Sequence, residues 1–190
     1  MALTPSTMLA LGTPCPEFSL PDTATGRTVS RGEFSGRPLL VMFICNHCPF
    51  AKHVAPELSR LGRDYAGKAG VVAISSNDAA QFPADAPALM KEEAALWGYP
   101  FPYLHDASQS VAKAFSAACT PDFFLFDAAH RLAYRGQLDE TRPTRISSGV
   151  YAHESMPHGR DLRTALDAVV AGRAAPEAQL PSIGCNIKWK

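Results

Sequence analysis

The sequence predicts an α/β fold in which a mixed central sheet is covered by helices on both faces. Residues 39–44 (LLVMFI) form a continuous apolar run, which is typical of a strand buried on both faces. Residues 49–65 carry apolar side chains spaced by three and four, which predicts a helix with one buried face. Two short apolar runs, 123–126 and 132–134, flank the turn-forming residues 127–130 and predict an antiparallel hairpin.

The rest of the chain supplies the other elements. They are, in chain order, a hairpin in residues 18–35, a buried strand at 71–75, helices at 86–97 and 110–117, and a closing helix at 161–171. Gly98 and Gly172 directly follow two of these helices, at the place where glycine most often ends a helix. Residues 143–158 show no periodicity, so they predict a surface loop with His153 and His158 in solvent. Parallel strands joined by helices and followed by a hairpin give a mixed sheet.

Composition excludes several classes of protein. Eighteen Lys and Arg balance eighteen Asp and Glu, whereas a nucleic-acid binder usually shows a basic surplus. No stretch approaches the ~20 apolar residues of a membrane helix. Residues 1–17 contain no Lys or Arg to begin a secretory signal, so we expect a cytoplasmic protein with reduced thiols. Five cysteines in 190 residues are too few for a disulfide scaffold and are better interpreted as individual chemical groups.

Two cysteines lie where the first buried strand ends and a helix begins. Pro49 favours the first helical position, which places Cys48 at or beside the N-cap. Cys48 then faces unpaired N–H groups and the positive end of the helix dipole. Such a place lowers the pKa of a cysteine from ~8.5 to between ~3.5 and ~7.5. Cys45 lies three residues earlier, close to the end of the strand.

Four interpretations of this CxxC segment stay open. The two cysteines are ordinary buried residues, or half of a zinc site completed by His53, Cys119 or Cys185. Alternatively, they form a dithiol that exchanges with disulfides, or one of them is a peroxide-reactive thiolate. The coincidence of strand end, helix start and CxxC spacing favours the two redox interpretations.

The segment resembles the thioredoxin superfamily, and more closely the peroxiredoxin-like redoxin (alkyl hydroperoxide reductase/thiol-specific antioxidant) family. Residues 40–48 (LVMFICNHC) are similar to the strand that leads into the first active-site cysteine of thioredoxin, and residues 52–56 to its helix with a kinking proline. Residues 11–22 resemble the N-terminal extension of redoxin proteins. The likeness runs over residues 11–172. It implies one thioredoxin-like domain spanning 1–190, with an N-terminal strand extension and a C-terminal tail at 173–190.

The resemblance places the thioredoxin nucleophile on Cys48 and the second cysteine of the thioredoxin motif on Ala51, so this CxxC is displaced by three residues. Cys48 followed by proline also resembles the peroxidatic site of peroxiredoxins. Those proteins carry a threonine three residues before the cysteine and a proline seven before, where this chain has Cys45 and Val41. These two departures argue against efficient peroxidase chemistry.

The resemblance also implies that Thr120 and Pro121 form a cis-proline turn beside the nucleophile and shape a substrate groove. In the tail, Cys185 is either an exposed cysteine, which we slightly favour, or a resolving thiol for oxidised Cys48. Cys119 is expected in the core and Cys15 is expected to be incidental.

The function expected from the sequence is that of a thiol–disulfide oxidoreductase. Cys48 attacks a disulfide, and Cys45 is the first choice for the thiol that resolves the mixed disulfide. The expected partners are protein or small-molecule disulfides, with no nucleic acid and no membrane; the reducing partner is unknown, and neither a cofactor nor a metal is required. The alternatives are a weak peroxiredoxin-like thiol peroxidase, and a non-catalytic binding module with structural or zinc-bound thiols.

Overall fold

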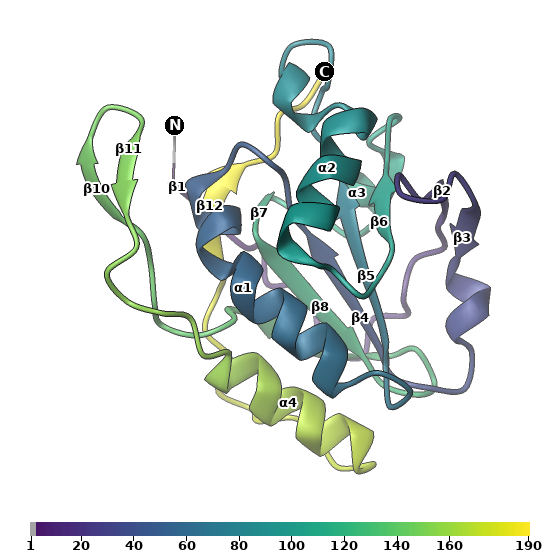
Figure 1. The fold of residues 1–190 in the computed structure, drawn as a ribbon. Coiled ribbons are helices and arrows are strands. Elements are labelled where there is room, and N and C mark those ends of the chain that lie inside the picture. Colours follow the sequence, from purple (N-terminus) through teal and green to yellow (C-terminus); the bar gives the residue numbers. More distant parts are fainter. Residues whose placement is uncertain (1–2) are drawn as a thin grey trace.

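A five-stranded mixed sheet forms the centre of the computed structural model, which describes residues 3–190 (Figure 1). Its strand order is β6–β5–β4–β8–β9. The strands are β4 (Leu39–Phe43), β5 (Gly70–Ser75), β6 (Tyr103–His105), β8 (Asp122–Phe126) and β9 (Leu132–Gly136). Strands β4, β5 and β6 are parallel, while β8 and β9 run antiparallel to β4 and to each other. The predicted mixed sheet and its closing hairpin are therefore confirmed.

Helices cover both faces of this sheet, as the sequence predicts. The helices are α1 (Pro49–Asp64), α2 (Pro87–Trp97), α3 (Ser110–Ala114) and α4 (Arg160–Val170). Apolar side chains of α1, α2 and α4 pack in one core cluster against one face of the sheet. Helix α3 and the hairpin formed by β2 (Ser19–Pro21) and β3 (Thr28–Ser30) pack against the other.

The continuous apolar run of β4 is explained by its central position. All five residues of β4 are buried, and successive side chains of a strand point to opposite faces. Leu40 and Met42 thus enter the cluster beneath α1, while Val41 and Phe43 enter the cluster beneath α3. A strand that is covered on both faces has no polar side.

Helix α1 begins where the sequence predicts. Cys48 is its N-cap with extended backbone and Pro49 is the first helical residue, while Pro56 lies inside the helix. Leu58 and Leu61 are fully buried on the sheet-facing side. The end of β4 and the start of α1 are joined by only a few residues, so the Cys45–Cys48 segment is held between two packed elements.

A second, three-stranded sheet joins distant parts of the chain. Its order is β1 (Leu3–Pro5), β12 (Ile183–Asn186) and β7 (Cys119–Thr120), all antiparallel. Figure 1 shows β12, in yellow, close to the N-terminal end of α1. The tail therefore forms a strand between two others, and the expectation of an exposed tail cysteine is wrong: the Cys185 side chain is only 2% exposed. A single cysteine in a polar tail gives no sign in the sequence of the strands that will flank it.

The region expected to be a loop also contains regular structure. Strands β10 (Thr144–Ser147) and β11 (Val150–Ala152) form a hairpin that projects from the body of the protein (Figure 1). Its side chains are exposed or half-buried, which explains why the sequence shows no apolar periodicity there. Two short 3-10 helices, η1 (Arg31–Phe34) and η2 (Pro83–Asp85), complete the fold.

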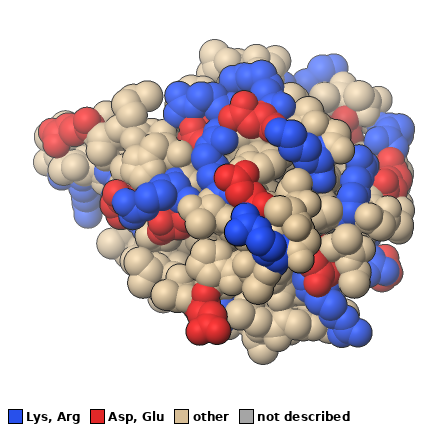
Figure 2. Space-filling view, turned by 90° about the horizontal axis from the view of Figure 1, so that it is seen from below, with Lys and Arg blue, Asp and Glu red and all other residues tan. Residues whose placement is uncertain are grey.

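Charged side chains of both signs are intermingled on the surface seen from below in Figure 2. On that face, Lys and Arg side chains alternate with Asp and Glu side chains, in keeping with the balanced composition. Among residues 3–190, no helix combines the length and the apolar character needed to cross a bilayer.

Candidate active site

Three thiols from separate elements meet around Thr120. Cys48 comes from the start of α1, Cys45 from the segment after β4, and Cys185 from β12. The Sγ atom of Cys48 lies 2.9 Å from Sγ of Cys185 and 3.1 Å from the carbonyl oxygen of Thr120. The Sγ atom of Cys45 lies 3.3 Å from Oγ1 of the same threonine. Cys45, Cys48 and Thr120 thus come together as the sequence predicts, and Cys185 joins them.

Local backbone geometry produces this convergence. The peptide bond between Thr120 and Pro121 is cis, as the resemblance implies. Strand β12 pairs with β7 so that Cys185 is opposite Thr120. A Cβ atom on Gly184 would overlap the carbonyl group of Thr120, so only glycine lets the two backbones approach this closely.

The environment favours the thiolate on Cys48. Burial by itself would raise the pKa of Cys48, but hydrogen bonds from Cys185 and Cys45 and the backbone N–H of Ala51 lower this pKa well below its usual range. The pKa of Cys185 is raised, first by its hydrogen bond to Cys48 and then by burial. Two protonated thiols and a helix terminus therefore stabilise one buried thiolate.

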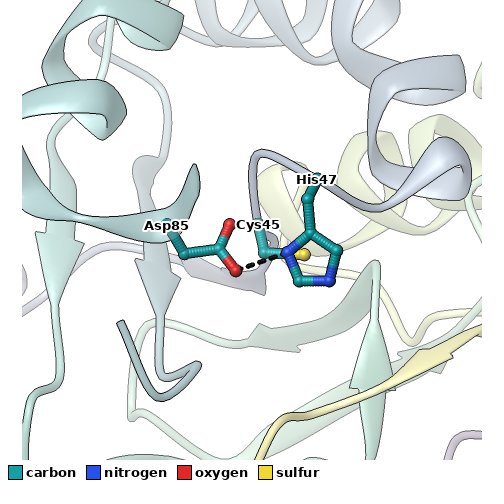
Figure 3. A group of neighbouring side chains, drawn as sticks. All are labelled: Cys45, His47 and Asp85. Atoms are coloured by element: carbon teal, nitrogen blue, oxygen red, sulfur yellow. Dashed lines mark hydrogen bonds and ion pairs between the residues drawn. The ribbon is translucent and has the colours of Figure 1, made fainter. Parts of the chain in front are cut away.

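The buried carboxylate of Asp85 lies near the Cys45 sulfur. Figure 3 shows Asp85, from η2, hydrogen-bonded to His47, with Cys45 beside the imidazole ring. The distance from His47 Nδ1 to Asp85 Oδ2 is 2.6 Å, and Asn77 and the N–H of Asn46 also donate to this carboxylate, each over 2.8 Å. Burial acts to raise the pKa of Asp85, but these hydrogen bonds outweigh it and lower the pKa. Asp85 is therefore a charged group in the interior.

The pKa values of the two cysteines of the CxxC segment are shifted in opposite directions. The pKa of Cys45 is raised well above its usual value, first by burial, then by Cys48, and also by the Asp85 carboxylate. The pKa of Cys48 moves in the opposite direction. These opposite shifts favour the thiolate on Cys48, the second cysteine of the motif, and the thiol on Cys45. No spacing in the sequence connects Asp85 with the motif, so sequence reasoning missed this group.

Two clusters of potential metal ligands occur among residues 3–190. In the first, Cys45, His47 and Asp85 each offer a ligand atom within 4.8 Å of the others. However, His47 and Asp85 are already joined by the 2.6 Å hydrogen bond, which is shorter than the spacing of two ligands around a zinc ion. The second cluster consists of Asp139, Glu140 and His158, whose Asp139 carboxylate accepts backbone N–H groups.

A groove of about 460 Å³ reaches the thiol cluster from the surface. It is lined by Leu3, Phe50, Arg142, Pro143, Arg145, Tyr151, Ile183 and Cys185. Cys185 is the cysteine at its wall, whereas the Cys48 side chain is fully buried. A molecule in this groove meets β12 before it meets Cys48.

The remaining candidates lie outside the cluster. Cys119 is fully buried, and burial raises its pKa, as expected of a core residue. Cys15 packs in the cluster on the α3 side of the sheet, where burial raises its pKa to about 12. His53 does not form a group of potential zinc ligands with the described cysteines. Its Nδ1 lies 3.1 Å from Nδ1 of His153. His153 is exposed, as predicted, although its ring stacks on His53.

The model of the AhpC/TSA family matches residues 11–135. No curated protein matches the chain. Two solved structures are similar over nearly the whole length. An uncharacterized conserved protein from Geobacillus kaustophilus is 49% identical with a TM-score of 0.92, covering 100% of this chain and 97% of that one. A hypothetical protein from Sinorhizobium meliloti is 47% identical with a TM-score of 0.91, covering 98% of both chains.

A more distant structure shares the fold alone. The thioredoxin domain of a thiol-disulfide oxidoreductase from Bacteroides vulgatus is 19% identical with a TM-score of 0.57, covering 67% of this chain and 88% of that one. The mixed sheet, the cis-proline turn and this likeness together confirm the thioredoxin-like fold implied by the sequence.

Proposed function

Because this chain belongs to the AhpC/TSA family, we propose that it is a thiol–disulfide oxidoreductase whose nucleophile is the Cys48 thiolate. One observation carries the proposal: the sulfur of Cys48, with its lowered pKa, lies 2.9 Å from the sulfur of Cys185. A thiolate with a second thiol in contact is the arrangement that disulfide exchange requires, because the second thiol releases the mixed disulfide.

The chemistry proceeds in two exchange steps. The Cys48 thiolate attacks one sulfur of a substrate disulfide, forms a mixed disulfide and expels the other substrate sulfur as a thiolate. A second cysteine of the chain loses its proton to solvent and attacks the Cys48 sulfur, which expels the remaining substrate thiolate. The substrate disulfide gains two electrons and the two protein thiols lose them. A dithiol reductant then returns the protein to its reduced form.

The geometry favours Cys185 over Cys45 as the resolving thiol. Their pKa values are both raised, so neither competes with Cys48 as the first nucleophile. The sulfur of Cys185 lies 2.9 Å from that of Cys48, and a disulfide bond of about 2.0 Å needs a small further approach. Cys45 is held by Thr120 and acts as a hydrogen-bond donor to the thiolate.

The proposal is tested by reduction of a model protein disulfide with dithiothreitol as the terminal reductant. Cys48→Ser should abolish the catalysed rate, and Cys119→Ser, another fully buried cysteine, is the matched control and should keep it. Trapping with a substrate disulfide should give a mixed disulfide on Cys48 in Cys185→Ser and not in Cys185→Ser combined with Cys48→Ser. Full activity of Cys48→Ser would refute the assignment.

Thiol peroxidase activity is the second candidate, favoured by the family match and by the same thiolate. In this reaction Cys48 attacks a peroxide and becomes a sulfenic acid, and Cys185 displaces water to form the disulfide. The hydroxyl of Thr120 hydrogen-bonds Cys45 and does not replace the missing threonine before the nucleophile. Titration with one equivalent of hydrogen peroxide, followed by mass analysis, distinguishes the reactions: rapid oxidation of Cys48 supports peroxidase activity, and inertness toward peroxide excludes it.

A further inference from the structure

We propose that β12 occupies the binding site of a substrate strand, so that the site takes an extended peptide carrying a cysteine, and β12 must leave before such a peptide enters. This inference rests on the proposed exchange chemistry and adds the substrate class and the way in which the site is opened. Its first support is the burial of the nucleophile: the Cys48 side chain is 0% exposed, so no protein disulfide reaches it in this conformation.

Strand β12 presents a cysteine to the nucleophile in the way a substrate strand would. It pairs antiparallel with β7, in the register Cys185 to Thr120 and Asn186 to Cys119. The carbonyl of Thr120 contacts the Cys48 sulfur, so the residue paired with Thr120 is brought to the nucleophile. An extended peptide added to the edge of β7 in this register would place its own cysteine at the same point.

The edge of β7 is available to another strand once β12 has left it. Strand β7 is only two residues long, and β12 is its neighbour in the three-stranded sheet. Outside that pairing, Ser182 Oγ donates to the carbonyl of Pro121 over 2.6 Å, and the N–H of Lys188 donates to Asn77 over 2.8 Å. On its other edge β12 pairs with β1, and the N–H of Ile187 donates to the carbonyl of Ala118 over 3.1 Å. The departure of β12 therefore opens the three-stranded sheet and leaves the five-stranded sheet intact.

The register also sets a requirement on the incoming peptide. A Cβ atom at position 184 would overlap the carbonyl carbon and oxygen of Thr120 and come within 3.1 Å of the Pro121 nitrogen. A peptide that pairs in this register therefore needs glycine directly before its cysteine. Side chains farther along the peptide would enter the adjacent groove, which presents the rings of Phe50 and Tyr151 and the guanidinium group of Arg145.

The same strand completes the exchange cycle. With β12 displaced, the Cys48 thiolate attacks the peptide disulfide and expels the other half of it as a thiolate. When β12 returns to β7, Cys185 arrives deprotonated by solvent, attacks the Cys48 sulfur and expels the peptide thiolate. The chain loses two electrons and the peptide disulfide gains them. Strand exchange on β7 thus couples substrate release to resolution.

Gly184→Ala tests this directly, because the added methyl group would force β12 away from Thr120 without altering a thiol. We expect alkylation of Cys48 by iodoacetamide to become at least tenfold faster, and backbone amides of β12 to lose hydrogen-exchange protection. The matched control is Gly32→Ala, where a Cβ meets nothing closer than 3.8 Å; it should behave as wild type. If the Gly184→Ala protein misfolds, Ser182→Ala, which removes the bond to Pro121, should give the same changes more weakly.

A peptide experiment tests the site itself. The peptide PSIGSNIK copies residues 181–188 with serine in place of the cysteine. Added to the Gly184→Ala protein, it should slow the alkylation of Cys48, whereas PSIASNIK should not. Loss of β12 protection with an unchanged Cys48 alkylation rate would overturn the proposal, as would equal protection by both peptides. Rapid alkylation without any disulfide reduction would instead refute the oxidoreductase function and leave the gating by β12 intact.

Discussion

Replacing Asp122 by asparagine should stabilise the protein above neutral pH. Asp122 lies on β8 opposite Phe43 of the central strand β4, and its side chain is 0% exposed. Burial raises its pKa from the ordinary 3.8 to about 7, against the opposing effect of hydrogen bonds such as that from the Ala118 N–H. The folded protein therefore holds a proton that the unfolded chain releases at lower pH.

The direction and size of the effect follow from this difference. A raised pKa contributes stability that is fully present below pH 3.8 and is lost as the pH rises through about 7. At about 1.4 kcal/mol for each pKa unit, the total is about 4 kcal/mol, of which about 3 kcal/mol falls between pH 5 and pH 8. Asparagine has nearly the same shape and no charge, so Asp122→Asn should escape this loss.

Urea unfolding at pH 5 and at pH 8 measures the difference. The free energy of unfolding of Asp122→Asn minus that of wild type should increase by about 3 kcal/mol between the two pH values. Glu177→Gln removes the same charge from an exposed side chain and should show no such increase. A difference that stays within about 0.5 kcal/mol across the range would refute the claim that Asp122 is protonated by burial.

Two further predictions concern the core and the thiols. Leu58→Ala, at a fully buried position of α1, should lower the free energy of unfolding by about 2–5 kcal/mol, whereas Leu96→Ala, at a side chain 75% exposed, should change it by less than about 0.5 kcal/mol; urea unfolding checks both. Cys185→Ala removes a hydrogen-bond donor and should raise the pKa of Cys48, measured by the pH dependence of thiolate absorbance with Cys48→Ser as the blank. An unchanged pKa would contradict the proposed role of Cys185 in stabilising the thiolate.

Much of the fold could be predicted because local patterns reflect the environment of each element. The apolar run of β4 predicts a strand covered on both faces, and Pro49 indicates where α1 begins. The hairpin of β10 and β11 could not be predicted, because its mostly exposed side chains leave no periodic pattern. The place of β12 was missed for another reason: a four-residue strand in a tail is recognised only by its neighbours.

For the candidate site, local sequence specifies which cysteine lies at the start of helix α1. The N-cap position of Cys48 depends on Pro49 and on the end of the preceding strand, which are all neighbours along the chain. The resemblance to the thioredoxin superfamily predicts the cis peptide bond between Thr120 and Pro121, which the structure contains. Local sequence is sufficient here because a helix terminus is a local structure.

The groups that surround the Cys48 sulfur depend on tertiary contacts. Asp85 and Cys185 lie far from Cys48 in the sequence, and no spacing relates either of them to it. Strand pairing brings Cys185 to 2.9 Å from the Cys48 sulfur, and the 3-10 helix η2 brings the buried Asp85 carboxylate beside Cys45. A pKa depends on burial and on charges and hydrogen bonds that arrive through space, so the selection of Cys48 as thiolate and Cys45 as thiol is a property of the folded chain.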